Sequence, residues 1–218
     1  MTEPLQIDFV SDVACPWCAV GLASLERALE RLGDEVPVRI RFQPFELNPQ
    51  MGPEGQDMTE HLTQKYGSTA EQQAQAREGI RQRGAEVGFT FRPEGRGRVW
   101  NTFDAHRLLH WAGEQGERQQ RDLKMALLEA YHGQGRSPAD PAVLLDAAQA
   151  AGLDRAQAQL VLESGRYANE VRDKEREFQQ LGISAVPSVI VNMKHLIQGG
   201  QPPEVFEQAL RQLAASRG

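Results

Sequence analysis

Residues 5–33 read LQIDFVSDVACPWCAVGLASLERALERLG and contain the only two cysteines of the 218-residue chain, Cys15 and Cys18. Apolar side chains at positions 5, 7 and 9 alternate with polar ones, which predicts a strand with one buried face. Apolar residues at 18, 22, 25, 29 and 32 form one stripe at helical spacing, and Gly33 ends the predicted helix. The cysteine pair therefore lies between a strand and the helix that follows it.

The rest of the chain predicts the remaining elements of an α/β fold. Residues 38–42 alternate like a second strand, and a β-α-β unit favours parallel strands with a right-handed crossover. Ala, Gln, Glu, Arg and Leu dominate residues 48–182, which predicts several helices. Residues 187–191 predict a strand covered on both faces, residues 194–198 a further short strand, and the chain after Gly200 a last helix.

This order predicts a thioredoxin-like fold with a large all-helical insertion between the β-α-β and the C-terminal β-β-α halves. Residues 1–47 and 183–218 would form a discontinuous thioredoxin-like domain. Residues 48–182 would form the insertion, with its last helix packing on the sheet.

Composition excludes several function classes. The net charge is −6 and no basic stretch is present, so we expect no nucleic-acid partner. No apolar stretch approaches the ~20 residues that span a bilayer, so we expect no membrane association. The N-terminus lacks the basic start and apolar run of a secretory signal. We therefore expect a cytoplasmic protein, and in that compartment catalytic disulfides are commoner than structural ones.

The position of the pair at a helix start predicts different roles for the two sulfurs. Unpaired backbone N–H groups and the positive helix end would stabilise a thiolate on an exposed Cys15, the form that attacks disulfides. Cys18 lies one turn further on the apolar stripe and would be the buried resolving thiol. Pro16 suits the helix start because its missing N–H would have no partner there. Trp17 would cover one side of the site.

Three less specific readings compete with this one. Two cysteines at this spacing can be ordinary core residues, since free Cys is often buried. A zinc site needs four ligands, and nothing in the sequence brings His106 and His110 to the pair, so we predict no metal. Pro187 can be a proline tolerated at the first position of a strand, and the sequence alone does not predict a cis bond, since only about 5% of X-Pro bonds are cis.

Several motifs in a fixed order point to one family. They are the cysteine motif with Gly21, Val186-Pro187 opening a later strand, Ser11-Asp12, Pro44-Phe45-Glu-Leu-Asn48-Pro49, Asn101-Thr-Phe-Asp-Ala-His106-Arg, and Gly199-Gly-Gln-Pro202. With this set the chain resembles the DsbA-like thioredoxin-fold oxidoreductases over essentially its whole length. More narrowly it resembles their FrnE branch, which is related to 2-hydroxychromene-2-carboxylate isomerases and kappa-class glutathione transferases.

The resemblance implies a thiol–disulfide oxidoreductase with Cys15 as nucleophile and Cys18 as resolving thiol. Pro187 becomes a cis-proline opposite the disulfide, and the backbone of Val186 becomes the place where a substrate chain pairs as an added strand. The best-known DsbA proteins carry His where this chain has Trp17. We therefore predict a less depressed pKa for Cys15 and a less oxidising couple than theirs.

Three further residues are candidates with two readings each. Asp12 either caps the following helix or helps proton transfer to Cys18. Asn101 and His106 either line the cleft from the helical side or have structural roles.

Three functions remain open at this level. The leading one is a redox enzyme that acts on disulfides or thiols of proteins or small molecules, as oxidant, reductant or isomerase. The second is a glutathione-dependent isomerase or transferase, whose relatives commonly place Ser at the first cysteine position. The third is a non-catalytic peptide-binding protein. We expect no bound cofactor beyond the redox-active pair, with glutathione as a candidate reductant or co-substrate, and many relatives form homodimers.

Overall fold

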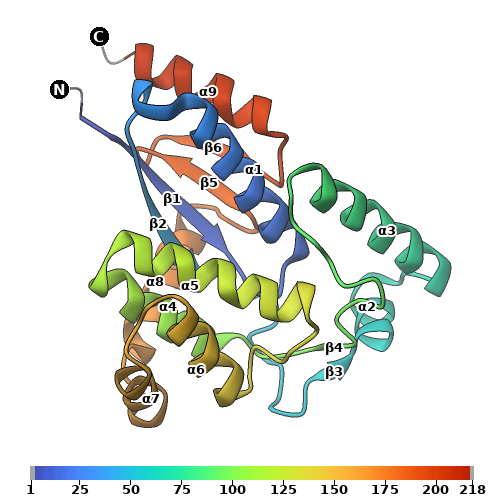
Figure 1. Cartoon of the computed structure of the whole chain (residues 1–218). Helices are drawn as coiled ribbons and strands as arrows, with labels where there is room; N and C mark the ends of the chain where they lie inside the picture. The colour runs from blue at the N-terminus through green and yellow to red at the C-terminus, as the bar shows by residue number, and fades with distance from the viewer. Residues whose placement is uncertain (1–2, 217–218) are drawn as a thin grey trace.

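A four-stranded mixed sheet forms the centre of the molecule in a computed structural model that describes residues 3–216 (Figure 1). The strand order is β2-β1-β5-β6. The parallel pair is β1 (Leu5–Ser11) and β2 (Val38–Pro44), while β5 (Ser188–Val191) runs antiparallel to β1 and β6 (His195–Gln198) antiparallel to β5. The predicted thioredoxin-like α/β fold is confirmed.

Helices cover both faces of this sheet. On one face α1 (Pro16–Leu32) and α9 (Pro203–Ala215) lie side by side, as Figure 1 shows. Their apolar stripes pack against the alternate side chains Leu5, Ile7 and Phe9 of β1. On the other face Phe178 packs against Val10 and Ile190. Both faces of β1 are therefore covered by helices. A one-residue slip in strand pairing would move every side chain of β1 to the opposite face, so this packing fixes the register.

The block between the two halves of the sheet is built mainly of helices. They are α2 (Met58–Tyr66), α3 (Ala70–Glu86), α4 (Phe103–Gln115), α5 (Glu117–Leu128), a π-helical turn (Glu129–Gly133), α6 (Pro141–Ala150), α7 (Arg155–Ser164) and α8 (Ala168–Gln180). The block also contains a two-residue ladder, β3 (Gln56–Asp57) with β4 (Arg98–Val99), and so differs from the all-helical prediction. Two-residue strands are too short to produce an alternating sequence pattern.

The predicted end of the first helix at Gly33 is confirmed, and two aspartates cap later helices. Gly33 caps α1, and the short 3₁₀ turn Gly33–Glu35 follows it. The Asp140 and Asp154 side chains accept hydrogen bonds from the first turns of α6 and α7. None of the helices in the described part of the chain is long and apolar enough to cross a membrane.

Candidate active site

The two cysteines occupy the first turn of α1. Cys15 is the N-cap residue in an extended conformation, and the Cys18 N–H donates to the Cys15 carbonyl oxygen at 3.1 Å. Cys18 is fully buried, and Cys15 is 5% exposed. We expected Cys15 to be exposed, and the structure corrects this: its thiol lines a cavity instead of the outer surface.

The surroundings of the two thiols shift their pKa values in opposite directions. A hydrogen bond from the Cys18 thiol, helped by backbone N–H groups of Cys18 and Trp17, lowers the pKa of Cys15 although burial opposes it. Burial, followed by the hydrogen bond to Cys15, raises the pKa of Cys18 well above its usual value. Both are free thiols in this structure. The arrangement therefore makes Cys15 the more easily ionised thiol of the pair.

Residues 186 and 187 lie opposite Cys15. The Val186–Pro187 peptide bond is cis, and the Cys15 thiol donates to the Val186 carbonyl oxygen at 3.5 Å. Gly21 makes this close packing feasible, since a Cβ there would lie 2.9 Å from Pro187 Cγ and 3.4 Å from Gly200 Cα. Segments 165 residues and more apart along the chain thus meet at the start of α1.

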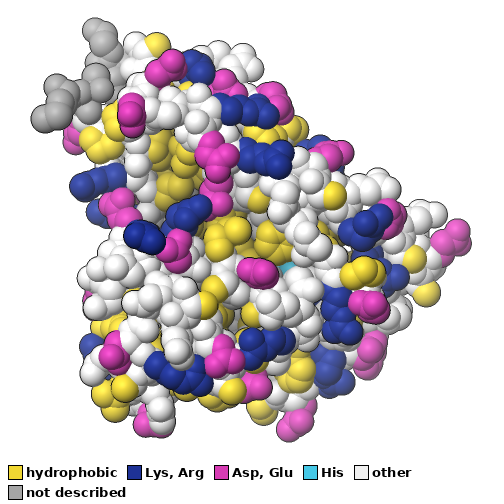
Figure 2. All heavy atoms as spheres, viewed as in Figure 1, with side chains coloured by type: hydrophobic (Ala, Val, Ile, Leu, Met, Phe, Trp, Pro, Cys, Tyr) yellow, Lys and Arg dark blue, Asp and Glu magenta, His cyan; other side chains and the backbone are white. Residues whose placement is uncertain are grey.

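A front cavity of about 740 Å³ opens beside Cys15. Its walls come from Pro16 and Trp17, from Val186, and from α2, α3 and the segment 91–97 of the insertion. Trp17 is 39% exposed at its rim. Four arginines line it, Arg77, Arg81, Arg92 and Arg96. Figure 2 shows Lys and Arg side chains gathered with acidic ones over the α2–α3 side of the molecule.

Asp12 is buried directly before the cysteine motif. Its carboxylate accepts hydrogen bonds from the N–H groups of Ala14 (3.0 Å) and Leu47 (2.7 Å) and from the Thr102 hydroxyl (2.7 Å). Burial alone would raise the pKa of Asp12, but the interaction with His106 and these N–H donors bring it below its usual value. The carboxylate therefore ties the loop before Cys15 to the insertion, and its side chain does not cap α1.

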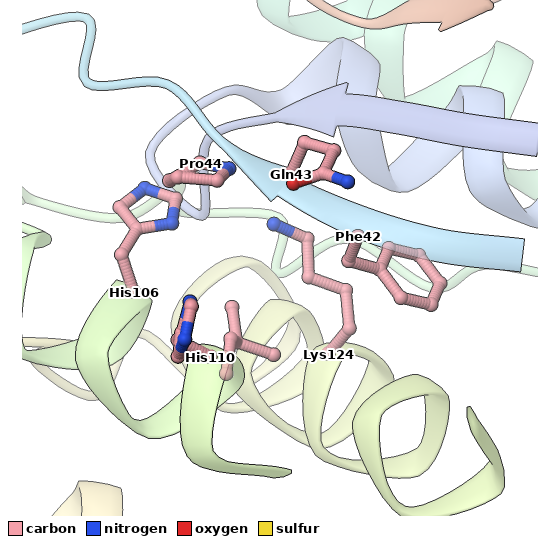
Figure 3. A pocket seen from close by; sticks show the side chains of 7 residues that line it. Phe42, Gln43, Pro44, His106, His110 and Lys124 are labelled. Carbon is pink, nitrogen blue, oxygen red and sulfur yellow. The ribbon is translucent and has the colours of Figure 1, made fainter. Parts of the chain in front are cut away.

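Asn101 and His106 do not line the front cavity, so the expectation that they face the cleft is corrected. The Asn101 side-chain amide donates a hydrogen bond to the Met51 carbonyl oxygen and accepts one from the Phe103 N–H at the start of α4. His106 is buried, with its Nε2 3.4 Å from Asp12 Oδ1. It borders a separate rear cavity of about 10 Å³, lined by Phe42, Gln43, Pro44, His106, Leu109, His110 and Lys124 (Figure 3).

Two buried residues at the site were missed from the sequence. Lys124 is 1% exposed and interacts electrostatically with Cys18, Asp12 and Cys15. His132 places Nε2 2.8 Å from the Val13 carbonyl oxygen, and burial brings its pKa well below the usual value. The burial of Lys124 could have been predicted, because this lysine falls on the apolar stripe of α5. The sequence around His132 contains no periodicity that would have predicted its burial. Within residues 3–216 no group of three or more His, Cys, Asp or Glu is arranged to hold a metal.

Known proteins share this architecture. A family model described as DSBA-like thioredoxin domain matches residues 6–211. The crystal structure of a probable DsbA oxidoreductase from Streptomyces coelicolor is 36% identical, with a TM-score of 0.89 over 98% of this chain and 91% of that one. The uncharacterized protein YwbO of Bacillus subtilis is 26% identical over 207 residues, 94% of this chain and 96% of its own length. A 2-hydroxychromene-2-carboxylate isomerase, 15% identical, shares the fold with a TM-score of 0.70 over 97% of both chains.

Proposed function

Because the chain belongs to the DSBA-like thioredoxin domain family, we propose that it is a thiol–disulfide oxidoreductase that cycles Cys15 and Cys18 between dithiol and disulfide. The observation that carries the proposal is the asymmetry of the pair. Cys15 faces the large front cavity with a lowered pKa, and Cys18 is fully buried with a raised one.

In the first step the Cys15 thiolate attacks one sulfur of a substrate disulfide. A mixed disulfide forms between Cys15 and that sulfur, and the other substrate sulfur leaves as a thiolate. The N-cap position supports this step because the backbone N–H groups of Trp17 and Cys18 stabilise negative charge on Cys15.

In the second step Cys18 loses its proton and attacks the Cys15 sulfur. The mixed disulfide breaks, the Cys15–Cys18 bond forms, and the substrate leaves reduced by two electrons in total. The reverse sequence oxidises a substrate dithiol. No bound cofactor enters either direction, and we propose glutathione among the thiols that restore the dithiol.

We propose that Val186 holds the substrate backbone. Its carbonyl oxygen is at the Cys15 thiol, and its N–H makes no hydrogen bond within residues 3–216. An extended substrate segment next to the cysteine would pair with these two groups as an added strand. Trp17 and the front cavity would then accommodate its side chains, in a protein disulfide or a smaller one.

A glutathione-dependent isomerase or transferase is the alternative enzyme. In such an enzyme the glutathione sulfur is the nucleophile, so no resolving thiol is needed, and the relatives commonly carry Ser at the first position of the motif. This chain has retained both cysteines, and its microenvironments make the two sulfurs unequal. Redox chemistry uses both features, and transferase chemistry uses neither.

Insulin reduction with dithiothreitol tests the proposal. We expect the wild-type protein to accelerate the reaction and Cys15→Ser to abolish the acceleration. Equal rates for the two proteins would overturn it. Activity toward an electrophile with glutathione that survives Cys18→Ser would favour the transferase, and peptide binding without any turnover would favour a binding protein.

A further inference from the structure

Arg96 connects the helical insertion to the loop that carries Cys15. Its Nη1 donates a hydrogen bond to the Ala14 carbonyl oxygen at 2.5 Å. That carbonyl belongs to the peptide unit that joins Ala14 to Cys15, and all three residues line the front cavity. Among the charged side chains that line this cavity within residues 3–216, only Arg96 forms a hydrogen bond with the loop before Cys15.

Neighbouring elements hold the Arg96 guanidinium in this place. Its Nη2 lies 3.5 Å from the sulfur of Met58 at the start of α2, and its central carbon lies 5.3 Å from the ring centre of Tyr131 in the π-helical turn. Gly95 and Gly97 have φ values of 78° and 76°, in the left-handed region that favours glycine, so the chain can turn on both sides of Arg96. The side chain is therefore part of a built contact between the insertion and the cysteine loop.

The charge of Arg96 is not neutralised by a carboxylate. Two other arginines of the front cavity are paired with acidic side chains, Arg81 with Glu78 at 2.8 Å and Arg92 with Glu94 at 3.0 Å. Arg96 makes no ion pair within residues 3–216. A guanidinium does not lose its proton in a protein, so this positive charge is present at every pH near neutrality.

Negative charge near the Cys15 sulfur gives this cation a role. The hydrogen bond from Cys18 and burial have the largest effects on the pKa of Cys15, and the buried Asp12 carboxylate raises it. The Ala14 carbonyl oxygen adds the negative end of a peptide dipole next to the same residue. A cation bound to that oxygen opposes both effects, because a neighbouring Arg or Lys favours a thiolate. The titratable groups around Cys15 also include His61, Lys124 and His132.

We infer that Arg96 is a positioning residue for the first step of the cycle: by binding the Ala14 carbonyl, its guanidinium fixes a permanent positive charge beside the peptide that leads into the attacking sulfur. The inference rests on the proposed function. In that step the Cys15 thiolate forms a bond to one substrate sulfur, and the other substrate sulfur leaves with the electron pair of the broken bond. Arg96 neither gives nor takes a proton.

The test measures alkylation of the reduced, full-length protein by iodoacetamide over a range of pH, with mass spectrometry of the peptide that contains Cys15. We expect Arg96→Met to move the half-maximal rate to higher pH. Below that midpoint the rate should fall by roughly three- to tenfold, since tenfold corresponds to one pKa unit. The two profiles should converge once Cys15 is ionised in both proteins. Arg118→Met, which removes an exposed arginine of α5 outside the cavity, is the matched control and should follow the wild type.

Two further variants separate the charge from a merely structural role. Arg96→Lys keeps a positive charge and a donor for the Ala14 carbonyl, and it should restore most of the wild-type profile. Arg96→Gln keeps an amide donor without the charge, and it should behave like Arg96→Met. The Gln variant also replaces the Met variant should the latter not fold. A purely structural role would lower the Tm of the Met variant and slow alkylation equally at every pH.

A pH profile of Arg96→Met that coincides with that of the wild type would overturn the inference, as would a slowing that is constant with pH or wild-type behaviour of Arg96→Gln. Insulin reduction distinguishes this failure from failure of the proposed function. An unshifted profile in a protein that reduces insulin overturns the inference alone. A shifted profile in a protein that does not reduce insulin overturns the proposed function and leaves only the effect of Arg96 on the Cys15 thiol.

Discussion

The front and rear cavities differ about seventyfold in size, roughly 740 Å³ against 10 Å³, and of the two only the front cavity is lined by a cysteine. The front one has Cys15, an exposed Trp17 and four arginines, and is large enough for a peptide or a small disulfide. The rear one has buried Lys124 and His106 and has room for no more than a water-sized molecule. The helical insertion thus contributes walls to the cavity that Cys15 faces and a buried lysine, Lys124, that interacts electrostatically with both sulfurs.

Replacing either cysteine should have the largest effect on activity of all the changes considered. Cys15→Ser should abolish both disulfide reduction and covalent capture of substrate, because no nucleophile faces the front cavity. Cys18→Ser should abolish turnover but accumulate a Cys15–substrate mixed disulfide, since only the second step is lost. Mass spectrometry under non-reducing conditions distinguishes the two variants. Capture by Cys15→Ser but not by Cys18→Ser would reverse our assignment of roles.

Gly21→Ala should disturb the packing of α1 against the cis-proline loop. The new Cβ would lie 2.9 Å from Pro187 Cγ, so the proline loop or α1 must shift. We expect a loss of about 1–3 kcal/mol in the free energy of unfolding, typical of overpacking, and slower substrate reduction. Gly79→Ala on α3, with nothing within 4 Å of the new Cβ, should gain about 0.5–1 kcal/mol. Equal denaturant midpoints for these variants would contradict the close packing.

The pH dependence of alkylation measures the difference between the pKa values of the two thiols. Iodoacetamide should modify Cys15 of the reduced protein with half-maximal rate below pH ~8.5, the value of an ordinary thiol, yet well above the ~3.5 of DsbA because Trp17 supplies no imidazole. The lowered pKa also adds stability to the reduced protein above the unfolded value, and this contribution is lost as the pH falls through the folded value. Cys18 should stay unmodified until higher pH. Simultaneous labelling of both thiols would contradict the asymmetry.

Removing one front-cavity charge should have the smallest effect. Arg77 lines the cavity and makes no ion pair within residues 3–216. For an anionic disulfide we expect Arg77→Ala to raise KM by roughly two- to fivefold at low salt, corresponding to at most about 1 kcal/mol, and to change nothing for a neutral one. Arg118→Ala on α5, outside the cavity, is the control. An equal change for both substrates would exclude a charge effect.

The sequence predicted the structure best where residues that are close in the chain also lie close together in the fold. The alternation in β1, the stripe of α1 and the place of Cys15 and Cys18 between them predicted the fold and the order of the sulfurs. Periodicity reports which face of one element is buried and carries no information on which elements meet. The position of Pro187 opposite Cys15 could therefore be predicted only from a family resemblance, and the electrostatic interaction of Lys124 with the two sulfurs could be found only in the three-dimensional structure.

The central claim is that the cysteine pair is a self-contained two-electron couple, and equilibration with glutathione redox buffers tests it most directly. Following Trp17 fluorescence, we predict one transition with a two-electron slope, a tenfold change in the equilibrium per ~30 mV, and a midpoint more reducing than the about −120 mV of DsbA. The transition should vanish in Cys15→Ser. A fluorescence that is constant across all buffers while both thiols remain open to alkylation after denaturation would contradict the account.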